Sequence, residues 1–415
     1  MKIKPTICRV AAVLAAAMMA LTVSAQKVKT GIEVLKANDF KQLEGKRVGL
    51  VTNPTGVDNF MKSDIDILHE AKNVKLVALF GPEHGVRGSA HAGDHVGNAA
   101  ADPTTGVPVY SLYGKNRTPS KEMLEGIDVL VYDIQDIGCR SFTYISTLGN
   151  VMKAAAEYGI KVMVLDRPNP LGGEKVEGNL AEDDCLSFVS AFKIPYVYGL
   201  TPGEVALLLN GENMLGKKCD LEVVKMKGWK RSMTYEQTGL QWVLPSPHIP
   251  QPVSAPFYSV SGIVGELDSI SIGVGYTLPF QMFGAPWVKA PELASRLNAL
   301  SLPGVMFRPM YYTPFYAFGK GKELQGVQVY FTDYRKAKLT DIQFYVLQEL
   351  YSLYPDHDVL DQASKSRKDM FDKVCGSKQI RQLFMKRHQW ADAKAYWEKD
   401  AEAFKQKAKK YWLYK

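Results

Sequence analysis

The chain of 415 residues lacks several short patterns that would assign it to a common functional class. It has neither a GxGxxG nor a GxxxxGK[ST] segment, so we expect no bound nucleotide or other cofactor. The HExxH zinc segment, the CxxC spacing and the GxSxG nucleophile turn are also missing. Because no run of Lys and Arg with interleaved aromatic residues is present, we expect no nucleic-acid partner. What remains is an ordinary globular composition, 46% hydrophobic and 23% charged, with enough apolar residues for a core.

The first 25 residues have the three-part organisation of a secretory signal peptide. A basic start is followed by an apolar run over residues 10–23 and by the small residues Ser24 and Ala25. This run is shorter than the about 20 residues that a membrane-spanning helix needs, and an uncleaved anchor is the alternative interpretation. We therefore expect cleavage after Ala25 and export to the periplasm or the medium. Beyond this segment no apolar run is long enough to cross a bilayer, so we expect no stable membrane insertion.

Cysteine is scarce, and its spacing indicates no pairing. The four cysteines beyond the leader are Cys139, Cys185, Cys219 and Cys375. Export would permit one or two disulfides, while buried free thiols fit the same scattered positions. Removing the three basic residues of the leader lowers the formal net charge from +8 to +5. A charge of that size suits a polyanionic wall surface without requiring one.

Four short apolar runs, each followed by a turn, predict strands that are buried on both faces of a parallel sheet. They cover residues 47–52, 75–80, 128–133 and 161–166. Helices are expected over residues 120–126 and 145–158, the second ending at Gly159 as a C-cap. A further helix begins at Thr201, where Glu204 completes a capping box. This strand–helix alternation predicts a Rossmann-like, doubly wound, mostly parallel α/β sheet.

A stretch rich in Pro and Ser, residues 241–262, predicts an irregular connection and a domain boundary. We expect a Rossmann-like catalytic domain over residues 26–240 and a smaller α+β domain over 241–415 that completes the cleft. The second domain is predicted to contain a helix over 291–300, a strand over 326–332, a helix over 340–353 capped by Thr340 and Gln343, and a Lys-rich amphipathic helix over 390–415. A solvated helix is the main interpretation of that last segment, and a wall-binding tail is the alternative.

Polar turns follow all four predicted strands, at residues 53–55, 81–88, 133–144 and 166–179. In open α/β sheets, sites form outside the carboxyl ends of the strands, so we expect these turns to converge on one pocket. The turns carry the carboxylates Glu83, Asp133, Asp136, Asp166 and Glu177. Glycoside cleavage commonly uses one carboxyl group as acid and a second group as base or nucleophile. The guanidinium groups that suit a substrate carboxylate are Arg87, Arg140 and Arg167.

Several of these acids have a structural alternative. Asp133 and Asp166 stand at strand ends, where short acidic side chains also cap helices and brace turns. Asp136 is four residues before Arg140 and fits a local salt bridge. Glu83 lies in a stiff turn and fits a solvated surface position as well.

Two other groups of residues suggest different chemistry. A zinc site is suggested by His84, His91, Asp94 and His95. Two glycines disfavour the helix that would bring the last two histidines together, so we expect no metal. Ser246 and His248 are close in sequence, but a serine hydrolase would need the missing nucleophile turn.

Ten segments carry a family resemblance: GIEVL (31–35), VGLVTNPTGV (48–57), LFGPEHGVRG (79–88), VPVYSLYG (107–114), DIQDIGCRSFTY (133–144), DRPNPLGG (166–173), VEGN (176–179), GLTPGEVA (199–206), WVLPSPHIP (242–250) and PFQMFGAPW (279–287). On these segments the chain resembles the NamZ/YbbC-like exo-β-N-acetylmuramidases, long catalogued as a domain of unknown function (DUF1343). The segments span nearly the whole chain beyond the leader, and their combination is highly specific.

The resemblance implies a Rossmann-like domain, a smaller C-terminal domain and an active site in the cleft between them. It implies an exo-acting glycosidase that releases N-acetylmuramic acid from the non-reducing end of peptidoglycan fragments, without metal or nucleotide. The family's proposed catalytic glutamate falls on Glu83. Candidates for its partner are His84, Asp133, Asp136 and Asp166. Candidates for substrate binding are Asn53, Arg87, Gln135, Arg140, Tyr144, Arg167, Asn169, Glu177, His248 and Tyr276.

Three segments depart from the family's usual pattern. His248 stands where an Asn is usual, and residues 198–201 (YGLT) replace His-Gly-Met-Thr. Residues 271–276 (SIGVGY) replace Ser-Glu-Gly-Arg-Gly-Thr, so a carboxylate and a guanidinium are missing. Glu266 and Tyr276 are candidates to compensate. The alternatives are therefore a catalytically weakened glycan-binding protein or, further away, a metal-dependent hydrolase. No pattern in the sequence indicates an oligomeric state.

Overall fold

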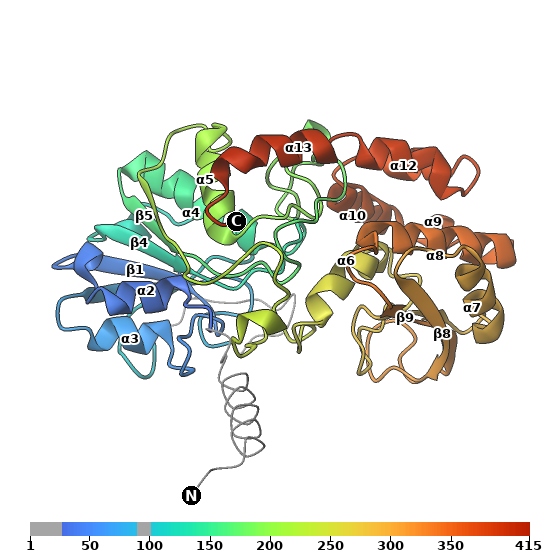
Figure 1. Ribbon diagram of the computed structural model, residues 1–415, viewed down its shortest axis with the longest axis horizontal. Helices are drawn as coiled ribbons and strands as arrows, with labels where there is room; N and C mark the ends of the chain where they lie inside the picture. Colours follow the sequence, from blue (N-terminus) through green and yellow to red (C-terminus); the bar gives the residue numbers. More distant parts are fainter. Residues whose placement is uncertain (1–26, 89–100) are drawn as a thin grey trace, which may run out of the picture.

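A computed structural model describes residues 27–88 and 101–415, which form two domains side by side (Figure 1). The first domain contains a six-stranded parallel sheet in the order β3-β2-β1-β4-β5-β6. Its strands are β1 (Arg47–Thr52), β2 (Lys75–Gly81), β3 (Val109–Ser111), β4 (Val129–Asp133), β5 (Lys161–Leu165) and β6 (Leu221–Val224). The four predicted strands are thus confirmed within one residue at each end. This is the doubly wound order, which reverses direction between β1 and β4.

Helices cover both faces of the sheet (Figure 1). They are α2 (Gly31–Ala37) and α3 (Asp64–Glu70) on one face, and α4 (Tyr144–Tyr158) and α5 (Pro202–Gly211) on the other. Alternate residues of β1 explain the two layers, because Val48 and Leu50 pack under α2 and α3 while Val51 packs in the cluster of α4 and α5. All three side chains are fully buried. A strand buried on both faces needs such a continuous apolar run.

The helix ends follow local chemistry. α4 ends at Gly159, which adopts a left-handed conformation with φ of 72°, as predicted. α5 begins with the predicted capping box of Thr201 and Glu204. The helix predicted over 120–126 is wrong, because that segment forms only a single 3-10 turn around the one buried apolar side chain of Leu124. A segment that short cannot offset the cost of helix nucleation.

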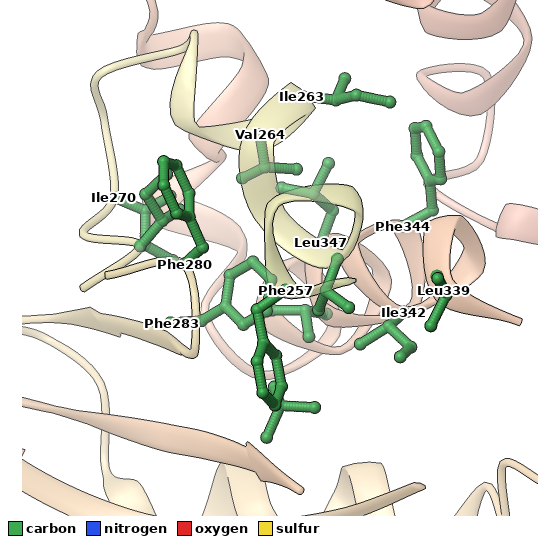
Figure 2. Packing of buried hydrophobic residues seen from close by; sticks show 14 of the residues in the cluster. Phe257, Ile263, Val264, Ile270, Phe280, Phe283, Leu339, Ile342, Phe344 and Leu347 are labelled. Carbon is green, nitrogen blue, oxygen red and sulfur yellow. The ribbon is translucent and has the colours of Figure 1, made fainter. Parts of the chain in front are cut away.

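The second domain contains an antiparallel sheet in the order β7-β9-β8, covered by helices. The strands are β7 (Met282–Ala285), β8 (Val305–Tyr312) and β9 (Leu324–Phe331). The helices are α6 (Ser254–Gly265), α7 (Ala290–Ala299), α8 (Leu339–Leu353), α9 (Val359–Gln362), α10 (Lys365–Cys375) and α11 (Lys378–Phe384). Phe257 and Val264 of α6 pack with Phe344 and Leu347 of α8 and with Phe283 of β7 (Figure 2). The same apolar cluster includes Ile137, Cys139, Leu171, Tyr196 and Val197 of the first domain.

Two expectations for this domain need correction. The irregular connection ends before Ser254, because α6 tolerates Pro256 in its first turn, where no backbone donor is required. The cap of α8 is supplied by Glu177 from the first domain, which accepts hydrogen bonds from the backbone of Leu339 and Thr340 at 3.2 and 2.9 Å. Gln343 instead donates to Ser259 O and accepts from the backbone of α6.

The C-terminal segment returns to the first domain. α12 (Trp390–Glu398) packs on the second domain, and α13 (Ala401–Ala408) crosses back towards α5 (Figure 1). The prediction of a solvated helix over 390–415 is wrong, because Trp390 and Trp397 are fully buried and Phe404 packs in the core of the first domain. Several isolated 3-10 turns complete the fold: η1 (Lys41–Leu43), η2 (Glu122–Leu124), η3 (Asp183–Cys185), η4 (Glu236–Thr238), η5 (Pro355–His357) and η6 (Lys409–Tyr411).

All four cysteines that lie in the described ranges are buried free thiols. Burial raises the pKa of Cys185 and of Cys219 to about 11. Across residues 27–88 and 101–415, no helix has both the length and the apolar character required to cross a membrane.

Candidate active site

A pocket of about 590 Å³ lies between the two domains. Its first wall comes from the loops after β2, β3 and β4 and from the first turn of α4. Its second wall comes from α6, α10 and the segment 270–280. A volume of this size is typical of a small-molecule site. The carboxyl ends of three parallel strands therefore face the second domain across a cavity.

Glu83 lies in a tight turn that follows the carboxyl end of β2. The backbone of Gly85 donates to Pro82 O at 3.0 Å, which closes a four-residue turn. His84, at the third position, has φ of 74°, as a type II turn requires. A left-handed conformation is unusual for a residue with a side chain, and such strain collects at functional sites. The turn presents both Glu83 and His84 to the pocket.

The neighbours of Glu83 in the pocket include three tyrosines. The hydroxyl of Tyr113, from the loop after β3, interacts with the Glu83 carboxylate. Burial and the negative charge of Glu83 raise the pKa of Tyr113 to about 12. Burial is also the main cause of the raised pKa of Tyr144 and Tyr258, and Glu83 adds to both. The phenols therefore stay protonated and serve as hydrogen-bond groups rather than as bases.

Aromatic side chains form much of the remaining wall. Tyr258 makes edge contacts with Phe142 and Phe280, with ring centroids 5.6 and 5.0 Å apart. All three residues line the pocket. The Tyr258 hydroxyl shares a 3.1 Å hydrogen bond with Ser141 Oγ. Apolar and aromatic walls with a few placed polar groups are the usual design of a ligand pocket.

The second domain contributes a carboxylate, Glu266, at the end of α6. Burial raises its pKa, and the nearby charge of Arg367 opposes that shift. Arg367 also bonds Asp268 at 3.3 Å. Tyr258 lies within the electrostatic range of both Glu83 and Glu266. The pocket thus holds Glu83 from the first domain and two carboxylates, Glu266 and Asp268, from the second.

Comparisons with known proteins agree with this architecture. The model of the NamZ exo-β-N-acetylmuramidase N-terminal domain matches residues 48–253, and that of the C-terminal domain matches residues 257–414. The peptidoglycan β-N-acetylmuramidase NamZ of Bacillus subtilis is 46% identical over 394 residues, covering 95% of this chain and 93% of that protein. The chain belongs to the NamZ family.

Solved structures of the family extend the comparison. A DUF1343 family protein from Bacteroides fragilis is 64% identical, with a TM-score of 0.91, and covers 94% of this chain and 99% of its own. A second DUF1343 protein from the same organism is 30% identical, with a TM-score of 0.73 and the same coverage. The NamZ fold therefore extends over nearly all of the chain.

Four of the residues predicted from the sequence line the pocket: Glu83, His84, Tyr144 and His248. Tyr144 begins α4 and donates its hydroxyl proton to Pro245 O. His248 Nε2 lies 2.8 Å from the Tyr316 hydroxyl. The loops after β2 and β4 thus contribute to the site, as expected.

The turns after β1 and β5 do not line the pocket, contrary to our expectation that all four turns converge there. A buried polar network fills the crevice between β1 and β4, where doubly wound sheets usually bind ligands. Arg167 pairs with Asp133, and Gln135 N donates to Thr55 Oγ1, whose partner is Asn53. The Gln135 side chain donates to the backbone carbonyls of Asp136 and Pro168. The side chains predicted for this crevice are therefore held inside the first domain and do not line the pocket.

Asp136 and Arg140 are also buried inside the protein. They do not form the salt bridge with each other that was the alternative prediction. Asp136 accepts hydrogen bonds from the Tyr198 hydroxyl and from Gly138 N. Burial raises the pKa of Asp136 to about 7. Arg140 donates to three backbone carbonyls and to Ser190 Oγ. Burial lowers its pKa to about 10.

Asp166, Asn169 and Glu177 have structural partners as well. Asp166 caps α5 through Gly203 N, at 2.8 Å, and burial raises its pKa to about 7. Asn169 shapes its own turn by bonding Leu171 N at 2.9 Å. Glu177 caps α8, as described above. The expectation that strand-end acids cap helices applies to Asp166.

Two further predicted residues lie outside the pocket wall. Arg87, a third exposed, pairs with Asp102 at 2.9 Å and lowers the pKa of that acid to about 2. Tyr276 stacks on Phe315 and packs beside Tyr312. Of the two residues considered as compensation for the altered segment, Glu266 faces the pocket and Tyr276 does not.

Within residues 27–88 and 101–415, no three His, Cys, Asp or Glu side chains are grouped to hold a metal ion. Three members of the suggested zinc site, His91, Asp94 and His95, lie outside the described residues.

Several residues of the pocket were not identified from the sequence: Tyr113, Arg117, Ser141, Phe188, Tyr258, Arg367 and Lys373. Tyr113 and Ser141 lie in the segments 107–114 and 133–144 that carry the family resemblance, so their positions were the available signal. Tyr258, Arg367 and Lys373 come from the second domain, and their approach to Glu83 depends on how the two domains pack. Ile272 and Val274, from the altered segment 271–276, line the same pocket.

Proposed function

We propose that this chain is an exo-acting β-N-acetylmuramidase that releases N-acetylmuramic acid from the non-reducing end of peptidoglycan fragments. The observation that carries the proposal is the position of Glu83 in the interdomain pocket, on a turn with a left-handed residue at His84. Membership of the NamZ family supports the same activity.

In this mechanism the Glu83 carboxyl group protonates the glycosidic oxygen as the bond breaks, and water completes hydrolysis at the anomeric carbon. The aromatic rings of Phe142, Tyr258 and Phe280 hold the apolar face of the sugar. Glu266 is the candidate second carboxylate, since Asp268 of the same pocket pairs with Arg367. The N-acetyl group of the sugar is the alternative partner, as in other hexosaminidases. Asp133, Asp136 and Asp166 are not part of this scheme because their side chains are internal.

The test is release of the chromophore from a chromogenic N-acetylmuramic acid glycoside by the wild type and by Glu83→Gln. We expect the variant to lose activity by about 10²- to 10⁴-fold, the usual contribution of a general acid. Glu125→Gln, an exposed residue of the same domain, is the matched control and should turn over at the wild-type rate. Equal rates for the wild type and Glu83→Gln would remove Glu83 from the acid's role.

A second candidate function is glycan binding without turnover. It is favoured by Ile272 and Val274, which line the pocket where family members usually carry an acid and an arginine. Tight binding of wall fragments by the wild type, with no release of sugar, would support this candidate over the first.

We also propose that residues 1–25 are a cleaved signal peptide and that the protein works in the periplasm or the medium, where its substrate lies. N-terminal sequencing of the exported protein should begin at Gln26. A chain that retains residue 1 and stays with the membrane would contradict cleavage.

A further inference from the structure

One cation of the pocket has an unusual setting. Arg117, from the loop after β3, lines the pocket and is exposed. Its guanidinium carbon lies 4.4 Å from the ring centroid of Phe188, another pocket residue. The backbone carbonyl of Arg117 accepts a 3.0 Å hydrogen bond from the Asn150 side chain on α4. The aromatic contact steadies the guanidinium, the Asn150 bond steadies the backbone of Arg117, and a guanidinium over a ring face keeps N–H donors for a ligand.

Arg117 and Glu83 belong to the same wall of the pocket. Tyr113, another residue of the pocket, has a pKa that the charge of Glu83 raises and the charge of Arg117 lowers. A ligand in this pocket is therefore exposed to both the Glu83 carboxylate and the Arg117 guanidinium. No acid of the described chain forms an ion pair with Arg117 within 4 Å, and its side chain contacts the Phe188 ring instead.

The opposite wall is less suited to an anion. Arg367 bonds Asp268 at 3.3 Å and also faces Glu266, so two carboxylates offset its charge. Lys373 is exposed on α10, and its ammonium is a point charge without the planar fork that matches a carboxylate. Val274 adds only an apolar surface. Arg117 is therefore the guanidinium of the pocket best able to bind an anionic group.

We infer that Arg117 binds the lactyl carboxylate of N-acetylmuramic acid and so selects this sugar over N-acetylglucosamine. The inference rests on the proposed function. The lactyl ether is attached at C3 and the scissile bond at C1, so the carboxylate and the glycosidic oxygen lie along one edge of the ring. Glu83 and Arg117 line the same pocket, so one sugar bound there can present its glycosidic oxygen to the first and its lactyl carboxylate to the second. Paired N–H donors favour a bidentate contact with the carboxylate.

The experiment measures the Kd of two sugars by calorimetry: N-acetylmuramic acid, and the same sugar with its lactyl carboxyl converted to a neutral amide. The wild type should bind the acid about 10- to 100-fold more tightly than the amide. Arg117→Gln should abolish that preference, because it weakens binding of the acid and leaves binding of the amide unchanged. Arg117→Lys, which keeps the charge and loses the fork, should show an intermediate preference. Lys115→Gln, an exposed residue of the same loop outside the pocket wall, is the matched control.

Three results would overturn the inference. One is an equal loss of affinity for acid and amide in Arg117→Gln, which indicates a structural role. The second is a preference that persists in Arg117→Gln and disappears in Arg367→Gln. The third is a wild type without preference for the acid. Because neither sugar has a scissile bond, a wild type that prefers the acid but releases no chromophore would contradict the proposed activity while supporting the role of Arg117.

Discussion

The hydroxyl of Tyr414, the penultimate residue, donates a 2.6 Å hydrogen bond to Asp166 Oδ2 at the end of β5. The same hydroxyl accepts a 2.9 Å bond from Met226 N, and the Tyr414 ring packs edge-on against Trp229 at 5.0 Å. The end of the chain therefore supports the sheet of the first domain after the whole second domain has been completed. An acid that the sequence offered as catalytic is thus a structural anchor.

Tyr414→Phe should lower the free energy of unfolding by about 1–2 kcal/mol. The substitution removes one donor to Asp166 and one acceptor for Met226, and it keeps the ring. Urea denaturation measures the change, and Tyr158→Phe, a half-exposed tyrosine at the end of α4, is the control with no expected effect. Wild-type stability in Tyr414→Phe would show that the tail is not an anchor.

Asp136→Asn should remove part of the pH dependence of stability. Burial raises the folded-state pKa of Asp136 to about 7. A raised pKa means that its contribution to stability is full below the unfolded pKa of about 4 and is lost as the pH rises through about 7. The free energy of unfolding of the wild type should therefore fall by about 3 kcal/mol between pH 5 and pH 8 because of Asp136.

An asparagine side chain does not ionise in this range. The free energy of unfolding of Asp136→Asn should therefore fall by about 3 kcal/mol less than that of the wild type between pH 5 and pH 8. Urea denaturation at pH 5 and pH 8 gives the comparison. Asp166, whose pKa is also raised to about 7 by burial, supplies the pH dependence that remains in the variant. If the wild type and Asp136→Asn lose the same amount, Asp136 is already ionised in the folded protein.

Arg140→Met should destabilise the protein by more than about 3 kcal/mol. The side chain donates to Asn179 O, Ile194 O and Val374 O at 2.9, 2.6 and 3.0 Å, so its removal leaves three buried acceptors unpaired. Val374 lies on α10, so the third of these bonds also joins the two domains. Arg47→Met, which breaks an exposed pair with Asp128, should change the free energy of unfolding far less than Arg140→Met does, because solvent screens that pair. A stable Arg140→Met variant with weakened sugar affinity would restore a binding role to Arg140.

Local signals in the sequence predicted much of the first domain. The apolar runs of β1, β2, β4 and β5 and the capping box of α5 depend on neighbouring residues only, so they could be identified directly. The segment containing Glu83 was found for the same reason, because its turn chemistry is local. The segment Glu122–Leu124 was predicted as part of a helix and forms a 3-10 turn. It is too short to show the hydrophobic periodicity that distinguishes the two.

The sequence by itself determined the doubly wound sheet and the turn that carries Glu83, because strand patterning, caps and tight turns are decided by adjacent side chains. Only the tertiary structure decided which acids face solvent. Asp133, Asp136 and Asp166 share a strand-end position with polar turns, yet Arg167, Tyr198 and Tyr414 enclose them. The second wall of the pocket was likewise decided by domain packing, which brings α6 and α10 opposite Glu83 through contacts between residues more than a hundred positions apart.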